Sequence, residues 1–574
     1  MHYAVKPCDP LAARELGKAL ELAPALAQVL LHRGFSDTAQ AREFLSPQLA
    51  GLSAPDAMLD RSRAADRLAR AIRRRERIAI FGDYDVDGTT SCAILAGILE
   101  QLGGVVHASV GNRWEGGYGL SDIALDRVLE SSPSVLVTCD CGSSDHERIA
   151  RAMKLGIDVI VVDHHLVPEQ ELPAFAFLNP HRPECGYEYK GLASAGLVLV
   201  LGAAVRAVLG VKLDLRDWLD LVALGTIADV APLDGDNRRL VRAGLSRLAS
   251  DSARPGIVAL RELARVRTRG SNQTSRAISA VDVAFRMTPR LNAAGRMGDP
   301  AITLALLRSR EVTQARQLAA RIEQLNDERK AIERHTTDRA YAQVLDCYSA
   351  APSCGVVLAG PDFHRGVVGI SAARVVDRFG VPAIVIAVDG EHAHGSARAP
   401  DGFPLFDAIQ RCASVLERFG GHHAAAGVTL RSDRIEQFRE LFAQATRDLA
   451  RESFESPTPI ADVALDPSVF ELPAPGDLVR LEPMGQANAE PVFLLPEARV
   501  VECGVVKDAH LKLMLRIGSR SISAFGYDMG ERREGRECPF EPGSLVHVLG
   551  HLRIDNWNGR EEVELRLVAP PQTA

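Results

Sequence analysis

The sequence has no apolar run long enough to cross a membrane. Its most hydrophobic stretch covers Ala195 to Val205 and ends at Arg206, well short of the roughly eighteen residues that a spanning helix needs. The N-terminal stretch MHYAVKPCDP also lacks the apolar core of a signal peptide. We therefore expect a cytoplasmic protein without a membrane association.

The sequence has few cysteines and no excess of positive charge. The 10 cysteines are scattered among 574 residues without a CxxC pair, which argues against a disulfide framework and fits a reducing compartment. Sixty-seven Lys and Arg stand against 74 Asp and Glu, a formal net charge of −7. A nucleic-acid partner would therefore have to be held by local basic patches.

The composition and length of the chain indicate a globular protein of several domains. Hydrophobic residues make up 46% of the chain and charged residues 25%, which excludes collagen-like, disordered and low-complexity proteins. From about residue 77, short apolar runs alternate with helical segments, a pattern typical of βαβ units with a mostly parallel sheet. Residues 301–350 contain neither Gly nor Pro and predict a long helix, either a connector between lobes or another core helix.

A second α/β segment follows this helix, and the tail alternates like short antiparallel strands of a small barrel. The predicted fold class is thus a multidomain α/β protein. Its parts are an N-terminal helical segment over 1–60, a parallel-sheet lobe over 61–300, the long connecting helix over 301–350, a second α/β lobe over 351–452, and an OB-like β-barrel over 458–574.

Acidic residues stand directly after three of the predicted strands, and a further acid ends an apolar helical run. Because the carboxyl ends of parallel strands meet where open α/β sheets bind ligands, we expect these side chains to cluster. A solvated turn with a helix cap is the alternative for any one motif. The residues are Asp83, Asp85, Asp87, Asp140, Asp163, His164, His165 and Asp229.

This set of side chains predicts the kind of metal and the kind of reaction. Oxygen ligands with one or two imidazoles suit Mn²⁺ or Mg²⁺ and not a thiolate zinc site. More carboxylates than one ion needs suggest two divalent cations that share a bridging carboxylate. Such a pair activates water and stabilises the leaving oxygen in phosphoryl hydrolysis, so the sequence predicts a metal-dependent phosphoesterase.

Four motifs, in this order and spacing, resemble those of the DHH phosphoesterase superfamily: GDYDVDGTTS, TCDCGSS, VVDHH and ALGTIADVAPL. Four more segments resemble one member family, the bacterial single-strand-specific exonucleases of the RecJ family. These are NRWEGGYGLS, MTPRLNAAGRMGDP, GSARAP and FGGHHAAAGV. The resemblance covers nearly the whole chain, including the long connecting segment and the β-rich tail.

The resemblance implies roles for the acidic cluster. Two divalent ions would be held by Asp85, Asp87, Asp140, His164 and Asp229, with Asp140 as the bridge. Asp163 would orient the neighbouring imidazole as an outer partner. His165 would donate to the scissile phosphate, and Asp83 would be either a ligand or an outer acid.

Candidate phosphate-binding residues lie in glycine-containing segments of the first lobe. Arg113 lies in RWEGGYG, and Arg290 and Arg296 flank NAAG in what we expect to be a similar loop. The planar fork of arginine can grip two phosphate oxygens. For any single arginine, surface solvation is the alternative interpretation.

The second lobe and the tail add further candidates for nucleic-acid binding. Ser396, Arg398 and His422 resemble the nucleic-acid-binding accessory domain called DHHA1. Trp557, in the tail's NWNG turn, is a candidate for stacking on unpaired bases, since aromatic and basic residues on a small barrel suit single strands. Filling the barrel core is the alternative for the tail's aromatic residues.

By resemblance, the expected function is metal-dependent, 5′-to-3′ hydrolysis of single-stranded DNA to 5′-mononucleotides in recombination and in mismatch or excision repair. Single-stranded-DNA-binding protein and a RecQ-type helicase would be partners of a monomeric enzyme. Two alternatives remain: a small-substrate DHH phosphodiesterase acting on oligonucleotides or cyclic dinucleotides, and a non-catalytic nucleic-acid-binding scaffold. The chain length and tail weigh against the first, and the intact acids weigh against the second.

Overall fold

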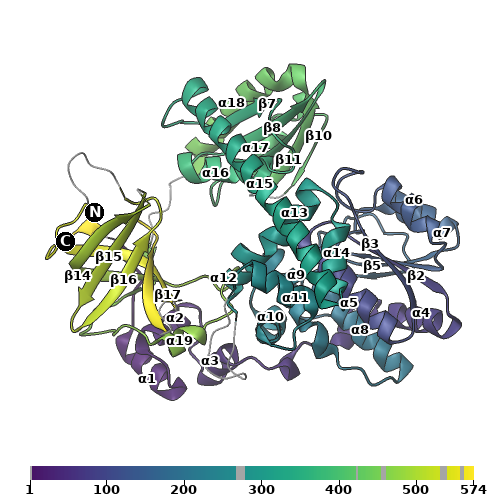
Figure 1. Cartoon of the computed structure of the whole chain (residues 1–574), viewed down its shortest axis with the longest axis horizontal. Helices are drawn as coiled ribbons and strands as arrows, with labels where there is room; N and C mark the ends of the chain where they lie inside the picture. Colours follow the sequence, from purple (N-terminus) through teal and green to yellow (C-terminus); the bar gives the residue numbers. More distant parts are fainter. Residues whose placement is uncertain are drawn as a thin grey trace.

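The computed structural model arranges the chain as three bodies, two of which are joined by one long helix (Figure 1). It describes residues 3–266, 278–421, 425–453, 460–507, 509–530, 539–555 and 561–574. Across these residues, no helix combines the length and the apolar composition that crossing a bilayer requires.

The first lobe is built on a five-stranded sheet in which every pairing is parallel. Its strands are almost continuously apolar because helices cover both faces, as a parallel sheet requires. The strand order is β3-β2-β4-β5-β6. The bounds are β2 (Arg77–Gly82), β3 (Val105–Val110), β4 (Val135–Cys139), β5 (Asp158–Val162) and β6 (Ala176–Leu178). The sheet confirms the predicted α/β class.

Alternate residues of β2, β4, β5 and β6 enter two different cores. Ile78 and Ile80 pack on one face with α4 (Arg61–Arg74), α5 (Val86–Gln101), α8 (Ser194–Leu209) and α9 (Leu219–Ala228). Ala79 and Phe81 pack on the other face with α6 (Asp122–Glu130) and α7 (His146–Lys154). Short 3₁₀ turns lie at η1 (Leu49–Gly51), η2 (Pro55–Ala57) and η3 (Leu215–Trp218).

Helices lead from this lobe to the second one. They are α10 (Gly235–Ala249), α11 (Pro255–Leu263), α12 (Ala280–Asp282), the π-helical turn η4 (Val283–Met287), α13 (Thr288–Met297), α14 (Ala301–Arg308) and α15 (Val312–Cys347). The long helix is confirmed as a connector: Ala315, Ala319 and Ile322 join the first lobe's core, whereas Ala340 and Val344 join the second's.

The long helix begins at Val312 and not at residue 301. Ser309 has extended backbone, with ψ 133°, and its hydroxyl donates to the Glu311 carbonyl at 3.1 Å. This local hydrogen bond competes with the helical pattern, as serine side chains often do. The prediction of one helix was wrong at this point because it relied on the absence of Gly and Pro.

The second lobe has a mixed five-stranded sheet in the order β10-β11-β9-β8-β7. Only β7 and β8 are parallel, and the other neighbours are antiparallel. The bounds are β7 (Val356–Gly360), α16 (Val368–Phe379), β8 (Ala383–Asp389), β9 (His392–Arg398), α17 (Leu405–Gln410), η5 (Ala413–Val415), β10 (Arg418–Gly421), β11 (Ala425–Arg431), η6 (Ser432–Arg434) and α18 (Ile435–Ser453).

The tail forms a closed ring of strands, which we call the β-ring. Because β14 pairs with both β15 and β17, the order β14-β15-β16-β18-β17 returns to its start. The bounds are β12 (Ile460–Ala461), β13 (Val463–Ala464), α19 (Pro475–Val479), β14 (Val492–Val506), β15 (His510–Ile517), β16 (Arg520–Gly526), β17 (Leu545–Asp555), β18 (Glu562–Leu567) and β19 (Gln572–Thr573).

The N-terminal helices pack on the β-ring, far from them in sequence (Figure 1). Leu26 and Leu30 share one apolar core with Phe493, Leu513 and Val548. The helices are α1 (Pro10–Leu20), α2 (Pro24–His32) and α3 (Thr38–Leu45), and the preceding β1 (Ala4–Val5) pairs in parallel with β12. The two ends of the chain thus build one body together.

A buried arginine joins this body to the first lobe. Arg238 of α10 is 2% exposed and donates to the carbonyls of Phe44 at 2.8 Å and of Pro483 and Leu481 at 3.1 Å each. It also donates to the Glu482 carbonyl at 3.0 Å and lies 3.8 Å over the Phe44 ring. One guanidinium therefore ties together three separate segments of the chain.

Candidate metal centre

The acidic cluster begins where β2 ends and α5 starts. Asp85 is the N-cap of α5, and its carboxylate accepts from the Gly88 N–H at 2.9 Å. The helix therefore starts at Val86, because Asp85 satisfies a free N–H of the first turn. A Cβ on Gly88 would lie 2.5 Å from the Asp83 nitrogen, so only glycine lets α5 pass this close to Asp83.

Asp87 points from the first turn of α5 into the protein. Its two carboxylate oxygens accept from the N–H groups of Ser194 at 2.8 Å and Ala195 at 3.0 Å, at the start of α8. The Ser194 hydroxyl in turn donates to Asp140 Oδ1 at 3.0 Å. The N-terminus of α8 thus positions two of the predicted acids.

Asp140 follows β4 and turns the chain sharply. Its backbone adopts a left-handed conformation with φ 64°, which aspartate tolerates better than most residues. The side chain is 1% exposed. The conformation holds this carboxylate beneath the cluster, where solvent does not reach it.

Asp163 follows β5 and accepts several hydrogen bonds. It receives them from the N–H of Ser143 at 3.0 Å, the N–H of His164 at 2.8 Å and the His165 ring at 2.7 Å. Burial acts to raise the pKa of Asp163, but the hydrogen bond and positive charge of His165 outweigh it and leave the pKa below its usual value. Asp163 is therefore an anion that fixes both histidines.

The pKa values of His165 and His164 are shifted in opposite directions. Burial acts to lower the pKa of His165, yet its hydrogen bond to Asp163 raises the pKa to about 9. Burial, followed by repulsion from His165, lowers the pKa of His164 to about 4. His165 is therefore a cation at neutral pH, and His164 is a neutral imidazole with a free electron pair.

His164 lies between two acids. Its Nε2 is 3.2 Å from Asp140 Oδ1 and 3.6 Å from Asp229 Oδ2, and this buried atom has no hydrogen-bond partner among the described residues. Two groups have ligand atoms that all lie within 4.8 Å of one another: Asp140, His164 and His165, and Asp87, His164 and Asp229. A neutral imidazole without a donor beside carboxylates is an arrangement that fits a cation.

The raised pKa values of the carboxylates also indicate a site that favours a cation. Burial, followed by repulsion from Asp85, raises the pKa of Asp87 to about 7. Burial, followed by repulsion from Asp87, raises the pKa of Asp229 to about 8. Burial and Asp85 also hold the pKa of Asp83 and Asp140 well above the usual value. Divalent cations would relieve this repulsion, so the donor set fits Mn²⁺ or Mg²⁺.

Sequence reasoning missed two residues of this site. Ser194 links Asp87 to Asp140, but a serine at the start of an apolar helix gives no signal of that role. The Tyr118 hydroxyl is 3.1 Å from the Asp140 carbonyl oxygen and 3.0 Å from His165 Nδ1. A tyrosine between glycines, in GGYG, is the signal that could have found it, because such loops approach ligands closely.

Arg113 and Arg296 lie on the same side of the cluster. The Arg113 guanidinium lies 4.5 Å over the Tyr84 ring. Arg296 donates to the Gly366 carbonyl of the second lobe at 3.0 Å, and burial followed by repulsion from Arg113 lowers its pKa to about 10. In the second lobe Arg398 donates to the Ser396 hydroxyl at 3.0 Å. These groups concentrate positive charge where the two lobes meet.

The remaining residues predicted to contact nucleic acid are not part of this positively charged group. Arg290 and Arg296 are on helix α13 and not in a loop, because Pro289 suits a first helical position and alanines follow it. Arg290 forms a two-pronged ion pair with Glu323 of α15, at 2.6 and 3.0 Å. His422 and Trp557 lie outside the described residues.

The fold and the acidic site together define a protein of the DHH family. The model for the DHH family N-terminal domain matches residues 77–226, the DHHA1 domain matches residues 352–448, and the RecJ OB domain matches residues 461–569. The sheet that ends in the acids and the β-ring fall within the first and last of these ranges.

More particularly, the chain belongs to the RecJ family. It is 34% identical to "Single-stranded-DNA-specific exonuclease RecJ" of Bacillus subtilis over 99% of the chain and 70% of that protein. It is 34% identical to the Escherichia coli protein of the same name over 88% of the chain and 89% of that protein. The crystal structure of Thermus thermophilus RecJ in complex with Mn²⁺ superposes with a TM-score of 0.80 at 30% identity, covering 100% of this chain and 80% of that one.

Proposed function

We propose that the protein is a metal-dependent exonuclease that hydrolyses single-stranded DNA from its 5′ end to 5′-mononucleotides, in recombination and in mismatch or excision repair. One observation carries this proposal: the buried, donor-free Nε2 of His164 between Asp140 and Asp229, in a chain whose relatives are single-stranded-DNA-specific exonucleases. The RecJ structures obtained with Mn²⁺ and with Mg²⁺ support the choice of cation.

The residues that would hold two cations are Asp85, Asp87, Asp140, His164 and Asp229, with Asp83 as an outer acid. Bound divalent cations lower the pKa of water and neutralise charge on a phosphate. Asp140 is the proposed bridge because it is buried and next to His164. Ser194 and the α8 N–H groups keep Asp140 and Asp87 in place.

The remaining residues act on the substrate directly. His165, kept protonated by its Nδ1 contact with Asp163, donates a hydrogen bond from its Nε2–H to an oxygen of the scissile phosphate. Arg113, Arg296, Ser396 and Arg398 bind neighbouring phosphates, and His422 and Trp557 are proposed contacts of the same strand. Arg290 is the exception: its guanidinium is paired with Glu323, so it would act indirectly by holding α13 against α15.

The proposal also covers the partners, the location, the oligomeric state and the domain organisation of the protein. Single-stranded-DNA-binding protein and a RecQ-type helicase are the proposed partners, and a cytoplasmic monomer is the proposed state. The division at residues 1–60, 61–300, 301–350, 351–452 and 458–574 is the proposed order of segments along the chain, in which the first and last segments share one core.

The deciding experiment uses single-stranded DNA labelled at the 5′ end or, in parallel, at the 3′ end, with Mn²⁺ or with EDTA. Early release of a 5′-labelled mononucleotide, late loss of the 3′ label and no reaction in EDTA are expected. Hydrolysis of dinucleotides with long strands left intact would instead indicate a small-substrate phosphodiesterase. Binding without hydrolysis would indicate a scaffold.

Mn²⁺ should stabilise the protein more at pH 8.5 than at pH 6. In the metal-free fold, the raised pKa values of Asp87 and Asp229 mean that the folded state keeps protons that the unfolded state has lost. Stability from these groups therefore falls as pH rises from about 4 to about 8. Cations bind the deprotonated carboxylates, so the increase in Tm with Mn²⁺, measured by scanning calorimetry, should grow over this range. An increase that is equal at both pH values would contradict this assignment.

The arginines should contribute to DNA binding electrostatically. Replacing Arg113 or Arg398 by alanine should reduce the slope of log K against log salt by about one unit each, since each phosphate contact releases about one counterion. Fluorescence anisotropy with labelled single-stranded DNA, in EDTA, measures the slope. Arg216→Ala is the matched control, because Arg216 pairs with Asp214 at an exposed site, and its slope should equal that of the wild type.

A further inference from the structure

A group of exposed arginines lies at the edge of the first lobe's sheet that is opposite to the acidic cluster. Every exposed residue of the segment 70–77, at the end of α4 and the start of β2, is an arginine. We call these residues the arginine patch: Arg70, Arg73, Arg74, Arg75 and Arg77. Figure 1 shows α4 on the side of the first lobe away from the β-ring body.

The arginine patch is remote from the metal centre. The strand β2 begins at Arg77, and Asp83 directly follows its last residue. Six residues at about 3.3 Å each put the two ends of this strand about 20 Å apart. The patch therefore takes no part in hydrolysis.

Neighbouring acids do not neutralise the arginine patch. Arg70 and Arg75 have no ion pair among the described residues, and the contact from Arg74 to Glu76 is long, at 3.9 Å. Glu76 instead lies 2.7 Å from the buried Arg67, so this acid turns inward. The guanidinium groups of the patch are left facing solvent.

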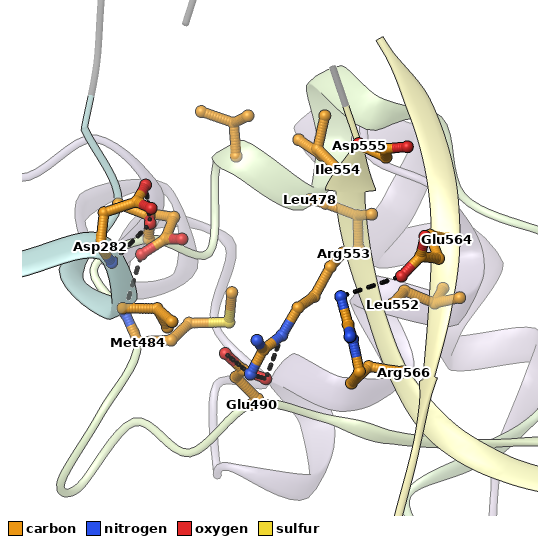
Figure 2. Close-up of a pocket in the computed structure, with 14 residues that line it drawn as sticks. Asp282, Leu478, Met484, Glu490, Leu552, Arg553, Ile554, Asp555, Glu564 and Arg566 are labelled. Atoms are coloured by element: carbon orange, nitrogen blue, oxygen red, sulfur yellow. Dashed lines mark hydrogen bonds and ion pairs between the residues drawn. The ribbon is translucent and has the colours of Figure 1, made fainter. Parts of the chain in front are cut away.

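Arginines elsewhere on the surface have carboxylate partners. Figure 2 shows a cavity of about 200 Å³ between the first lobe and the β-ring body. There Arg553 contacts Glu490 at 2.9 and 3.1 Å, and Arg566 contacts Glu564 at 3.0 Å. The charges of those arginines are balanced within the protein, whereas those of the arginine patch are available to an anionic partner.

Helix stability accounts for only part of the arginine patch. Cations in the last turn of a helix interact favourably with its dipole, and Arg73 and Arg74 occupy that turn of α4. Arg75 has left-handed backbone, with φ 54°, and ends the helix, and Arg77 lies beyond it in β2. Arg70 lies one turn before Arg74, about 6 Å along the axis and on the same face. The dipole therefore does not explain why positive charge gathers here in a chain with a net charge of −7.

The side chains of the patch indicate the chemistry of its partner. A guanidinium binds two phosphate oxygens at once, and duplex DNA carries one negative charge per about 1.7 Å of its axis. Stable protein interfaces have an apolar centre, and single strands are held by stacking on aromatic rings. The exposed residues of 70–77 offer neither, so a backbone of high charge density suits this surface best.

We propose that the arginine patch binds the backbone of double-stranded DNA, at a second site separate from the metal centre. This inference goes beyond the proposed exonuclease function, because it concerns a surface that does not take part in hydrolysis. Binding is weak and independent of sequence, as contacts to phosphates alone are. It keeps the enzyme close to duplexes that carry a single-stranded end.

The test measures binding of a fluorescent blunt-ended duplex by anisotropy, in EDTA, with excess unlabelled single-stranded DNA to occupy the substrate site. One variant combines Arg70→Gln, Arg74→Gln and Arg75→Gln. Its slope of log K against log salt should be shallower than that of the wild type by about 2.7, since each lost phosphate contact contributes about 0.9. Wild-type affinity should fall at least about 40-fold between about 50 and 200 mM salt, and the affinity of the variant should fall much less.

A matched control separates the patch from net charge. A variant with Arg14→Gln, Arg321→Gln and Arg434→Gln loses the same charge at exposed sites in three other parts of the chain, and its slope should equal that of the wild type. If the combined patch variant is unstable, Arg70→Gln alone should still make the slope shallower by about 0.9.

Two results would overturn the inference: equal slopes for the patch variant and the wild type, or tighter binding of poly-glutamate than of the duplex, which would indicate an acidic protein partner. Release of mononucleotides from a short 5′-labelled strand with Mn²⁺ should be the same in the wild type and both variants. A wild type that binds the duplex through the patch and releases no mononucleotide would overturn the proposed function alone.

Discussion

Asp140→Asn is expected to lower kcat for single-stranded DNA by about three orders of magnitude or more, as loss of a group that acts as one unit with its neighbours does. Asparagine keeps the shape of aspartate and also tolerates the left-handed backbone at this position. The variant should therefore fold normally. It loses the negative charge that lies 3.2 Å from His164 Nε2, and with it the proposed bridge between cations.

The measurement is single-turnover release of mononucleotides from 5′-labelled DNA, together with Mn²⁺ binding by titration calorimetry. Affinity for DNA in EDTA should stay within about twofold of wild type, because Asp140 is buried away from the strand. Asp214→Asn is the matched control, since it alters an exposed aspartate paired with Arg216. If Asp140→Asn kept a tenth of the activity, Asp140 would not bridge the cations.

Arg238→Met is expected to produce the largest loss of stability, about 3–5 kcal/mol, because it removes a buried charged donor that four carbonyls share. Burial, followed by repulsion from Arg242, lowers the pKa of Arg238 to about 9. The guanidinium therefore keeps its charge at neutral pH, and its hydrogen bonds go to backbone carbonyls. Removing it should weaken the junction between the first lobe and the β-ring body.

Scanning calorimetry and limited proteolysis measure this loss. Multidomain unfolding is seldom two-state, so the expected result is an early transition and new cleavage between residues 455 and 490. Arg238→Lys should be intermediate because an ammonium reaches fewer carbonyls than a guanidinium. Arg247→Met, at a surface pair with Asp217, should be close to wild type. Long strands should be degraded more slowly by Arg238→Met, while small phosphodiesters are hydrolysed normally; an unchanged first transition would contradict the junction's role.

The strands of the first lobe and the position of the acidic cluster could be predicted from the sequence. The strands that precede Asp83, Asp140 and Asp163 could be found because a parallel sheet demands continuous apolar runs, and strand ends converge by topology. The clustering of these acids with His164 followed from that geometry. The exact start of α5 could not be predicted in the same way, because capping by Asp85 is decided by one hydrogen bond.

The parts that sequence could not supply depend on contacts between distant segments. Nothing near Arg290 reveals that Glu323 neutralises it, and nothing near Ser194 reveals its contact with Asp140. The break before α15 depends on the side chain of Ser309 rather than on Gly or Pro. The periodicity of a segment predicts which of its residues are buried, but not which distant segment they pack against.

The shared core of the N-terminal helices and the β-ring has a consequence for synthesis of the chain. Helices α1 to α3 leave the ribosome before both lobes, yet the residues that complete their core begin at Val463. Since domains generally fold as units and N-terminal ones fold first, these helices must wait, with their apolar faces unpartnered, while both lobes are made. The catalytic lobes are in effect inserted into a split domain that closes last. A rearranged chain in which residues 3–45 follow residue 574 through a linker, on the body where both segments lie (Figure 1), would place both halves of that domain together and shorten the wait.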